Sequence, residues 1–189
     1  NSQYELFTES TVKKYDEEKD AYYRAKSLIR GLKMSIEDDS RIDKLIVETQ
    51  LALNQKFGFE AALGDVAWSV ANQLISKNFS NKDSYILQSI YFQMALYLHE
   101  SGRDHRELSA LSSQLQLKQY SGSDVVKYVE VLATDDSCEA CKSLAGKRFT
   151  VEEAFKNKVL PCRECSYGVD GEKIKYGWCR CCYTPIIKI

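Results

Sequence analysis

The chain has 189 residues, a length that fits one domain or a domain with a small appendage. Its formal net charge of -1 excludes a general polyanion binder, and its 44% hydrophobic content is that of an ordinary globular protein. No apolar stretch approaches the roughly 18 residues needed to span a bilayer, so no membrane association is expected.

The first part of the chain is predicted to be helical, because no proline occurs before residue 161 and apolar residues recur at helical spacing. A first helix begins near Ser10. A second follows an acidic turn and N-cap region over 37–40 and ends at Gly58. The expected apolar stripes are Tyr15, Tyr22, Ala25, Ile29 and Leu32 in the first helix, and Ile42, Leu45, Ile46, Leu51 and Leu53 in the second.

A third helix is predicted over 59–77, followed by a turn over 78–82. A fourth ends near Gly102, a plausible C′ residue, and a fifth opens with a variant capping box of Asp104 and Glu107. The expected apolar stripes are Ala62, Val66, Ala67, Val70 and Leu74, then Ile86, Ile90, Tyr91, Met94, Tyr97 and Leu98, then Leu108, Leu111 and Leu115.

The connection between the fourth and fifth helices is short, so these helices should pack antiparallel. The pair is similar to a tetratricopeptide-type hairpin. The consensus of that repeat does not recur at its period of about 34 residues, however, so a plain helical bundle is favoured. The expected fold is therefore mainly α, with tetratricopeptide-like hairpins as the alternative.

The composition changes at Ser121-Gly122-Ser123, which places a domain boundary between a helical domain, 1–121, and a cysteine-rich module, 122–189. A β-branched run over 125–132 predicts a short strand. A turn over 134–137 then leads to the first cysteine. Further on, a capping box of Thr150 and Glu153 predicts a short helix that ends near Lys158.

Cysteines are confined to the C-terminal module, where two CxxC pairs precede a tight cluster. A CxxC turn can direct two thiolates at one point, and zinc in structural sites takes four such ligands in a tetrahedron. We expect a reducing, cytoplasmic setting, because metal-type spacing occurs without a recognisable secretion signal. The candidate metal ligands are the seven cysteines Cys138, Cys141, Cys162, Cys165, Cys179, Cys181 and Cys182.

The spacing leaves open how the cysteines are shared between ions. The simplest four-cysteine site combines both CxxC pairs, 138–141 and 162–165. The other three cysteines would then serve a second zinc or a two-metal cluster with bridging thiolates, so one or two ions are expected. A redox-active CxxC is the less favoured alternative. The two histidines, His99 and His105, are expected at the surface or at helix ends rather than as ligands.

One stretch of the module resembles a known family. Residues 131–154 read Val-Leu-Ala-Thr-Asp-Asp-Ser-Cys-Glu-Ala-Cys-Lys-Ser-Leu-Ala-Gly-Lys-Arg-Phe-Thr-Val-Glu-Glu-Ala, and Cys-Arg-Cys follows at 179–181. Over about 125–182 this pattern resembles the C-terminal module of phage Mu F-like head morphogenesis (minor head) proteins. The resemblance implies one metal set of Cys138, Cys141, Cys179 and Cys181. Gly177-Trp178 stands where that family has His-Pro, and the other three cysteines are additional.

Catalytic patterns are weak throughout the chain, and we assign no catalytic residue. Pro161-Cys162-Arg163-Glu164-Cys165 matches half of the zinc deaminase signature, but the Glu residues that directly follow Cys138 and His99 are at the wrong spacing for its other half, and the α/β alternation of deaminases is absent. An all-thiolate site is closed and typical of structural zinc. A protein without catalytic activity in these residues is therefore favoured.

Basic and aromatic residues interleave near the C-terminus, a pattern that can form a stacking platform for single-stranded nucleic acid. The candidate nucleic-acid contacts are Lys173, Lys175, Trp178 and Arg180. Alternatively, these aromatic residues cover a small module that has little core of its own.

Two functions follow from these patterns. The favoured one is a non-catalytic, zinc-binding interaction or assembly protein in which the zinc is structural. Because residue 1 is Asn rather than Met, we expect a piece of a larger protein, and its partner is another protein or a preceding domain. The alternative is a nucleic-acid-binding accessory domain of a DNA- or RNA-processing protein.

Overall fold

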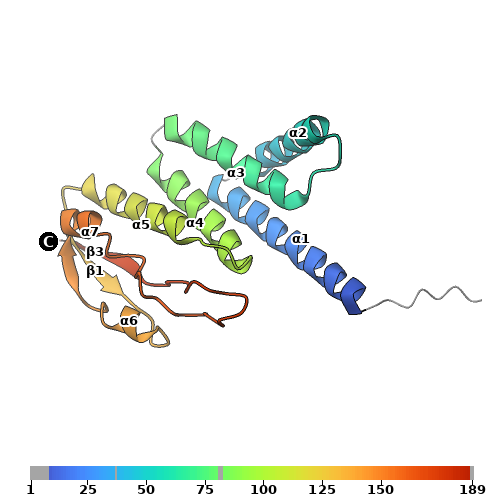
Figure 1. The fold of residues 1–189 in the computed structure, drawn as a ribbon. Coiled ribbons are helices and arrows are strands. Elements are labelled where there is room, and N and C mark those ends of the chain that lie inside the picture. Colours follow the sequence, from blue (N-terminus) through green and yellow to red (C-terminus); the bar gives the residue numbers. More distant parts are fainter. Residues whose placement is uncertain (1–8, 37, 81–82, 188–189) are drawn as a thin grey trace, which may run out of the picture.

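The computed structural model describes residues 9–36, 38–80 and 83–187. The described chain is mainly helical and ends in a small antiparallel sheet, as the sequence predicts (Figure 1). The first five helices are α1 (Glu9–Ile36), α2 (Asp39–Phe57), α3 (Leu63–Ser80), α4 (Ser84–Glu100) and α5 (Arg106–Ser121). The remaining elements are β1 (Val126–Leu132), α6 (Glu139–Lys142), β2 (Arg148–Thr150), α7 (Val151–Asn157) and β3 (Cys182–Ile187).

Several helix ends lie where the capping residues predict them. The Asp38 carboxylate accepts a hydrogen bond from the Arg41 N–H at 3.1 Å at the start of α2. Gly58 and Gly102 follow α2 and α4 with φ of 75° and 68°, in the left-handed region that glycine tolerates. Thr150 and Glu153 form a reciprocal capping box at the start of α7.

The third helix begins later than predicted, at Leu63 rather than residue 59, and it continues to Ser80. The preceding segment is held by α2 instead. Asn54 Oδ1 accepts from the Ala61 N–H at 2.7 Å, and Gln50 Nε2 donates to the Ala61 carbonyl at 2.9 Å. These bonds bury Ala61, so the expectation that Ala62 lies in the stripe is wrong. The predicted turn over 78–82 is helical as far as Ser80, and residues 81–82 lie outside the described residues.

The capping box predicted for α5 does not form. Asp104 precedes the helix, and its carboxylate binds both the backbone N–H and the guanidinium of Arg106. This pairing lowers the pKa of Asp104 to about 2. His105 occupies the N-cap position without a side-chain cap, so the first turn of α5 is fixed by Asp104 and Arg106 rather than by Glu107.

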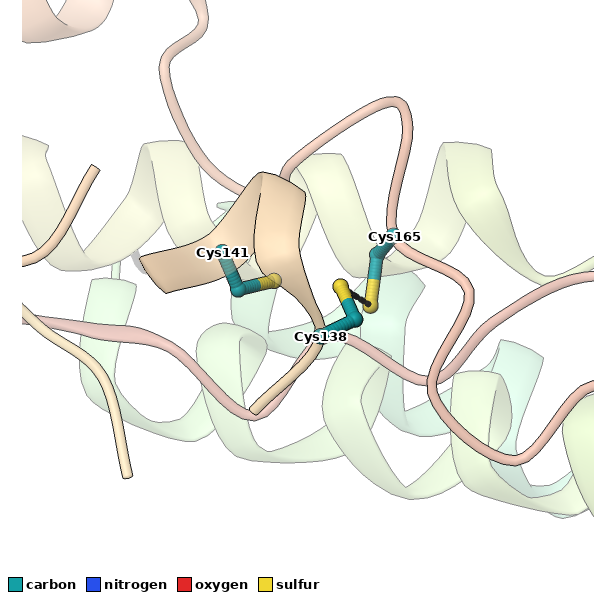
Figure 2. Close-up of side chains that lie close together, drawn as sticks. All are labelled: Cys138, Cys141 and Cys165. Carbon is teal, nitrogen blue, oxygen red and sulfur yellow. Dashed lines mark hydrogen bonds between the residues drawn. The ribbon is translucent and has the colours of Figure 1, made fainter. Parts of the chain in front are cut away.

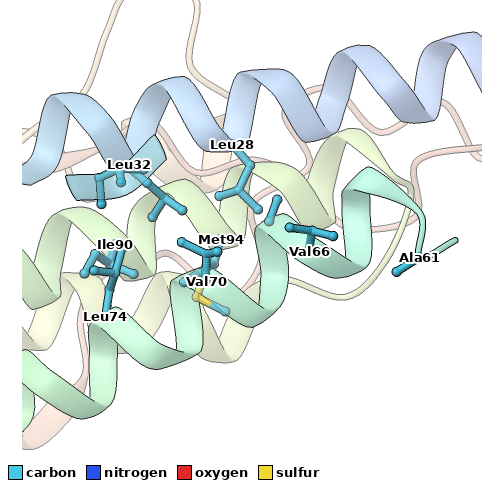
Figure 3. Packing of buried hydrophobic residues seen from close by; sticks show 11 residues of the cluster. Leu28, Leu32, Ala61, Val66, Val70, Leu74, Ile90 and Met94 are labelled. Carbon is cyan, nitrogen blue, oxygen red and sulfur yellow. The ribbon is translucent and has the colours of Figure 1, made fainter. Parts of the chain in front are cut away.

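The main core lies where α1, α3 and α4 meet, with α2 packed on α3 (Figure 3). The other four residues of the stripe predicted for α3, Val66, Ala67, Val70 and Leu74, are buried as predicted. On α1 and α2, however, Tyr22 and Leu51 were expected inside and are 46% and 63% exposed. The side chain of Tyr15 is outside the described part. The buried residues of this core are Leu28, Leu32, Ile42, Ala61, Val66, Ala67, Val70, Ala71, Leu74, Ile90 and Met94.

The helix α5 connects the helical core to the C-terminal sheet. It packs antiparallel to α4. Ser112 Oγ donates to the Gln88 carbonyl at 3.1 Å, and Gln119, further along α5, donates to the carbonyl of Ser84 at the start of α4 at 3.2 Å. Its other side places Leu117 in a second core with the sheet and α7. The strand order is β2-β1-β3, with both pairs antiparallel. The boundary between residues 121 and 122 stays a prediction.

A long connection between α7 and β3 leaves the sheet, runs along the α4–α5 hairpin and returns (Figure 1). This connection carries four of the seven cysteines, so its path positions the candidate site. Within the described ranges, no helix is both long and apolar enough to cross a membrane.

Candidate metal centre

The first cysteine pair is presented by a single helical turn after β1. The turn over 134–137 closes with a hydrogen bond from the Ser137 N–H to the Thr134 carbonyl at 2.9 Å, as predicted. Cys138 is then the N-cap residue of α6, and Cys141 lies within that helix, 2% exposed. Residues three apart on a helical turn share a face, so both thiols point to the same side.

The second pair comes from the connection before β3. The Cys165 N–H donates to the Cys162 carbonyl at 3.2 Å, which forms a tight turn. This turn brings Cys165 over the first pair, and its sulfur lies 3.9 Å from the sulfur of Cys138 (Figure 2).

The third group lies on the extended segment that enters β3. Alternate residues of an extended chain face the same side, so Cys179 and Cys181 both point to α6. The sulfurs of Cys141 and Cys179 are 3.8 Å apart. Cys182 takes the other side. It is exposed at the start of β3, opposite Leu132, and lies away from the remaining thiols.

Two trios of cysteines are close enough to hold a metal ion. In each trio all sulfurs lie within 4.8 Å of one another. The edge of a tetrahedron of sulfurs around zinc is about 3.8 Å, given a Zn–S bond of about 2.3 Å. The measured separations of 3.8 and 3.9 Å therefore match metal coordination. The first trio is Cys138, Cys141 and Cys165, and the second trio is Cys141, Cys179 and Cys181.

The thiols of the cluster differ in acidity. Burial raises the pKa of Cys138, but hydrogen bonds from the backbone of Ser166 and Cys141 outweigh it and hold the pKa at about 6. Burial raises the pKa of Cys165 to about 11 and, together with the charge of Cys179, that of Cys181 to about 12. The pKa of Cys141 is raised as well, by burial first. Because thiolates repel one another, a bound cation is what would let these buried thiols ionise together.

Arg180 contacts both of the other segments that carry cysteines. Its guanidinium forms an ion pair with Asp136 in the turn before Cys138, and a second contact reaches Thr134 Oγ1 at 3.3 Å. The same group stacks on the ring of Tyr167, 3.8 Å from its centroid. Arg180, predicted as a nucleic-acid contact, therefore holds the first cysteine turn against the last.

Trp178, a second predicted nucleic-acid contact, packs against the α4–α5 hairpin. Its ring centroid lies 5.2 Å from that of His99 and 5.1 Å from that of His105. Phe92 completes the cluster at 5.6 Å. The indole therefore packs against the hairpin, and its predicted contact with nucleic acid stays a prediction. Lys173 and Lys175 are exposed on the connection.

Both histidines lie at helix ends, as expected, but they are not exposed. His105 is 2% exposed and His99 is half-buried, with 5.0 Å between their ring centroids. His105 Nδ1 forms a hydrogen bond with Ser109 Oγ at 3.0 Å. Burial lowers the pKa of both rings, although the nearby carbonyl of Tyr176 partly opposes this shift. No sequence signal marked this cluster, because the histidines and Trp178 are brought together only by the long connection.

Comparison of the chain with protein-family models, with curated proteins and with solved structures gives no match.

Proposed function

We propose that the C-terminal module binds structural zinc and that the chain is a non-catalytic interaction or assembly protein. The observation that carries the zinc part is the pair of cysteine trios, in each of which the sulfurs lie within 4.8 Å of one another and one sulfur–sulfur separation matches the edge of a zinc tetrahedron. Thiolates are soft ligands that select zinc among the common divalent ions without redox activity. A site filled by four thiolates keeps no open position for a substrate, which favours a structural role.

The metal would organise a part of the chain that has little core. The second core consists of α5, the sheet and α7, whereas the connection before β3 contributes mainly Leu160, Val159 and the cysteines themselves. Between Pro161 and Cys181 the chain has no helix or strand. Cross-linking this connection to α6 through a metal would fix its path over the hairpin, since binding and folding are coupled in small metal modules.

Two observations support an interaction or assembly role. Residues 125–182 resemble the C-terminal module of phage Mu F-like head morphogenesis proteins, which points to assembly. In addition, α2 leaves Val47 and Leu51 58% and 63% exposed, one turn apart, and Phe57 stacks on Phe59 at its end. Exposed apolar groups of this kind mark protein contacts when they are contiguous. The nucleic-acid alternative gains no support, because Trp178 and Arg180 are engaged within the chain.

The test is elemental analysis of the full chain purified without added metal, followed by hydrogen exchange before and after chelation. We expect bound zinc, and we expect chelation to increase exchange in residues 138–181 far more than in α1, α3 and α4. A protein that carries no zinc and forms disulfides between these cysteines would contradict the proposal. Exchange that stays unchanged after complete zinc removal would contradict the structural role.

A further inference from the structure

Cys141 has more sulfur neighbours than a single tetrahedral site supplies. Around one ion bound by four cysteines, each sulfur faces three others along the edges of the tetrahedron. The sulfur of Cys141 lies within 4.8 Å of those of Cys138 and Cys165 in the first trio and of Cys179 and Cys181 in the second. Cys141 therefore sits at a corner that two coordination tetrahedra can share.

Cys162 lies between the same two trios. It completes no trio of sulfurs within 4.8 Å of one another, but its sulfur is near enough to Cys141, Cys179 and Cys138 to interact with them. Its backbone N–H also donates to the Cys179 sulfur at 3.3 Å. Cys162 thus has a neighbour from each trio in addition to the shared Cys141.

We infer that the cluster binds two zinc ions that share the thiolates of Cys141 and Cys162. The inference rests on the proposed zinc site and adds the second ion and the bridging residues. Two four-coordinate ions that share two ligands need six ligands in all. One ion is held by Cys138, Cys165 and the two bridging thiolates. The other is held by Cys179, Cys181 and the same bridging thiolates.

The six-cysteine count also explains which thiol is left over. Cys182 belongs to neither trio and is exposed on the far side of the extended segment. With one ion, two further thiols packed against the centre would have no metal. With two ions and six thiolates, every cysteine of the cluster is a ligand. The centre then carries about two negative charges, and Arg180 lies close enough to Cys165 to oppose them.

The stoichiometry of the full chain tests the inference directly. Elemental analysis and native mass spectrometry should give two zinc ions per chain, and a thiol reagent should modify one cysteine, Cys182, before chelation and all seven after it. One zinc per chain would overturn the binuclear centre and leave the structural zinc site intact. No zinc would overturn both. Replacement by ¹¹³Cd should give two coupled cadmium resonances, and a single resonance or two uncoupled ones would contradict shared thiolates.

Cysteine variants locate the bridge. Cys181→Ser should lower the zinc content from two ions to one, whereas Cys141→Ser should lower it to near zero because both ions lose a ligand. Cys182→Ser makes the same chemical change one residue away and should keep two ions. A Cys141→Ser protein that retains as much zinc as the Cys181→Ser protein would overturn the bridging role. The cadmium spectrum of the unsubstituted chain decides the question if a variant fails to fold.

Discussion

At the scale of single residues, the small second core is stabilised by a buried hydrogen bond as well as by apolar packing. Tyr183 is 3% exposed on β3, and its hydroxyl accepts a hydrogen bond from the Leu160 N–H at 2.9 Å. That bond fixes the start of the connection that carries Cys162 and Cys165. Burial raises the pKa of Tyr183 to about 12, so the hydroxyl stays neutral and available at ordinary pH.

We therefore expect Tyr183→Phe to destabilise the module. The substitution keeps the ring but leaves the buried Leu160 N–H without its acceptor, a loss of about 1–3 kcal/mol. Urea unfolding of the zinc-loaded protein measures this loss. Tyr128→Phe, at a residue that is 50% exposed on β1, is the matched control and should change the free energy of unfolding little. Equal effects of both substitutions would argue against the role assigned to the Leu160 contact.

A second prediction at this scale compares a buried leucine with an exposed one on the helices. Leu32 on α1 is fully buried, whereas Leu51 on α2 is 63% exposed. Leu32→Ala should lower the free energy of unfolding by about 2–5 kcal/mol, because it removes buried methyl groups and leaves a cavity. Leu51→Ala should stay within about 0.5 kcal/mol in the isolated chain. Thermal or urea unfolding compares them, and a large loss for Leu51→Ala would mean that α2 is packed differently.

At the scale of the elements, one capping prediction from the sequence is confirmed and another is wrong. The capping box at Thr150 forms because its hydroxyl accepts from the Glu153 N–H at 3.0 Å and the Glu153 carboxylate accepts from the Thr150 N–H at 2.9 Å. The Asp104 carboxylate instead accepts two hydrogen bonds from the guanidinium of Arg106, so it does not form a capping box with Glu107. Thr150→Ala should therefore destabilise α7 by about 1 kcal/mol. Glu107→Ala should leave the free energy of unfolding unchanged in the same assay. A loss as large as that of Thr150→Ala would mean that the predicted capping box of Asp104 and Glu107 does form.

The sequence identifies elements whose signals are local. Apolar spacing and caps such as Asp38, Gly58 and Gly102 act within a few residues, so these helix ends could be predicted. The segment before α3 could not, because its conformation depends on tertiary bonds from Gln50 and Asn54. The cysteines were recognisable as candidate metal ligands by type and spacing. Which sulfurs meet depends on how the long connection returns to α6, and that path has no local signature.

At the scale of the whole molecule, the candidate metal centre and the helical hairpin of α4 and α5 meet at Trp178. This residue lies beside Cys179, and its ring rests on His99 of α4 and His105 before α5. The contact means that a change in the protonation of the histidines can alter how the connection is seated on the hairpin. Neither His99 Nδ1 nor His105 Nε2 has a hydrogen-bond partner among the described residues, so a charge there would be poorly compensated.

The pH dependence of this contact has a definite sign. Burial lowers the pKa of both histidines below the value of 6.5 that they have when exposed, so the unfolded chain binds more protons between these values. Their contribution to stability is therefore full above pH 6.5 and is lost as the pH falls through the folded-state values. Among the neighbouring charges, Arg106 stays protonated, and Asp104 with a pKa of about 2 stays ionised across this range. Burial raises the pKa of Glu100, which gives that carboxyl the opposite dependence.

Trp178 offers a direct measurement, since its fluorescence reports the seating of the connection. Lowering the pH below 6.5 should shift its emission to the red and reduce the free energy of unfolding. The control is His105→Phe, which keeps an aromatic ring but removes one titrating group, so the pH dependence should weaken. Trp68, on α3, is the other tryptophan, and a Trp68→Phe background isolates the Trp178 signal. Zinc content measured on the same samples separates this effect from acid release of the metal, and an unchanged transition in His105→Phe with zinc retained would contradict it.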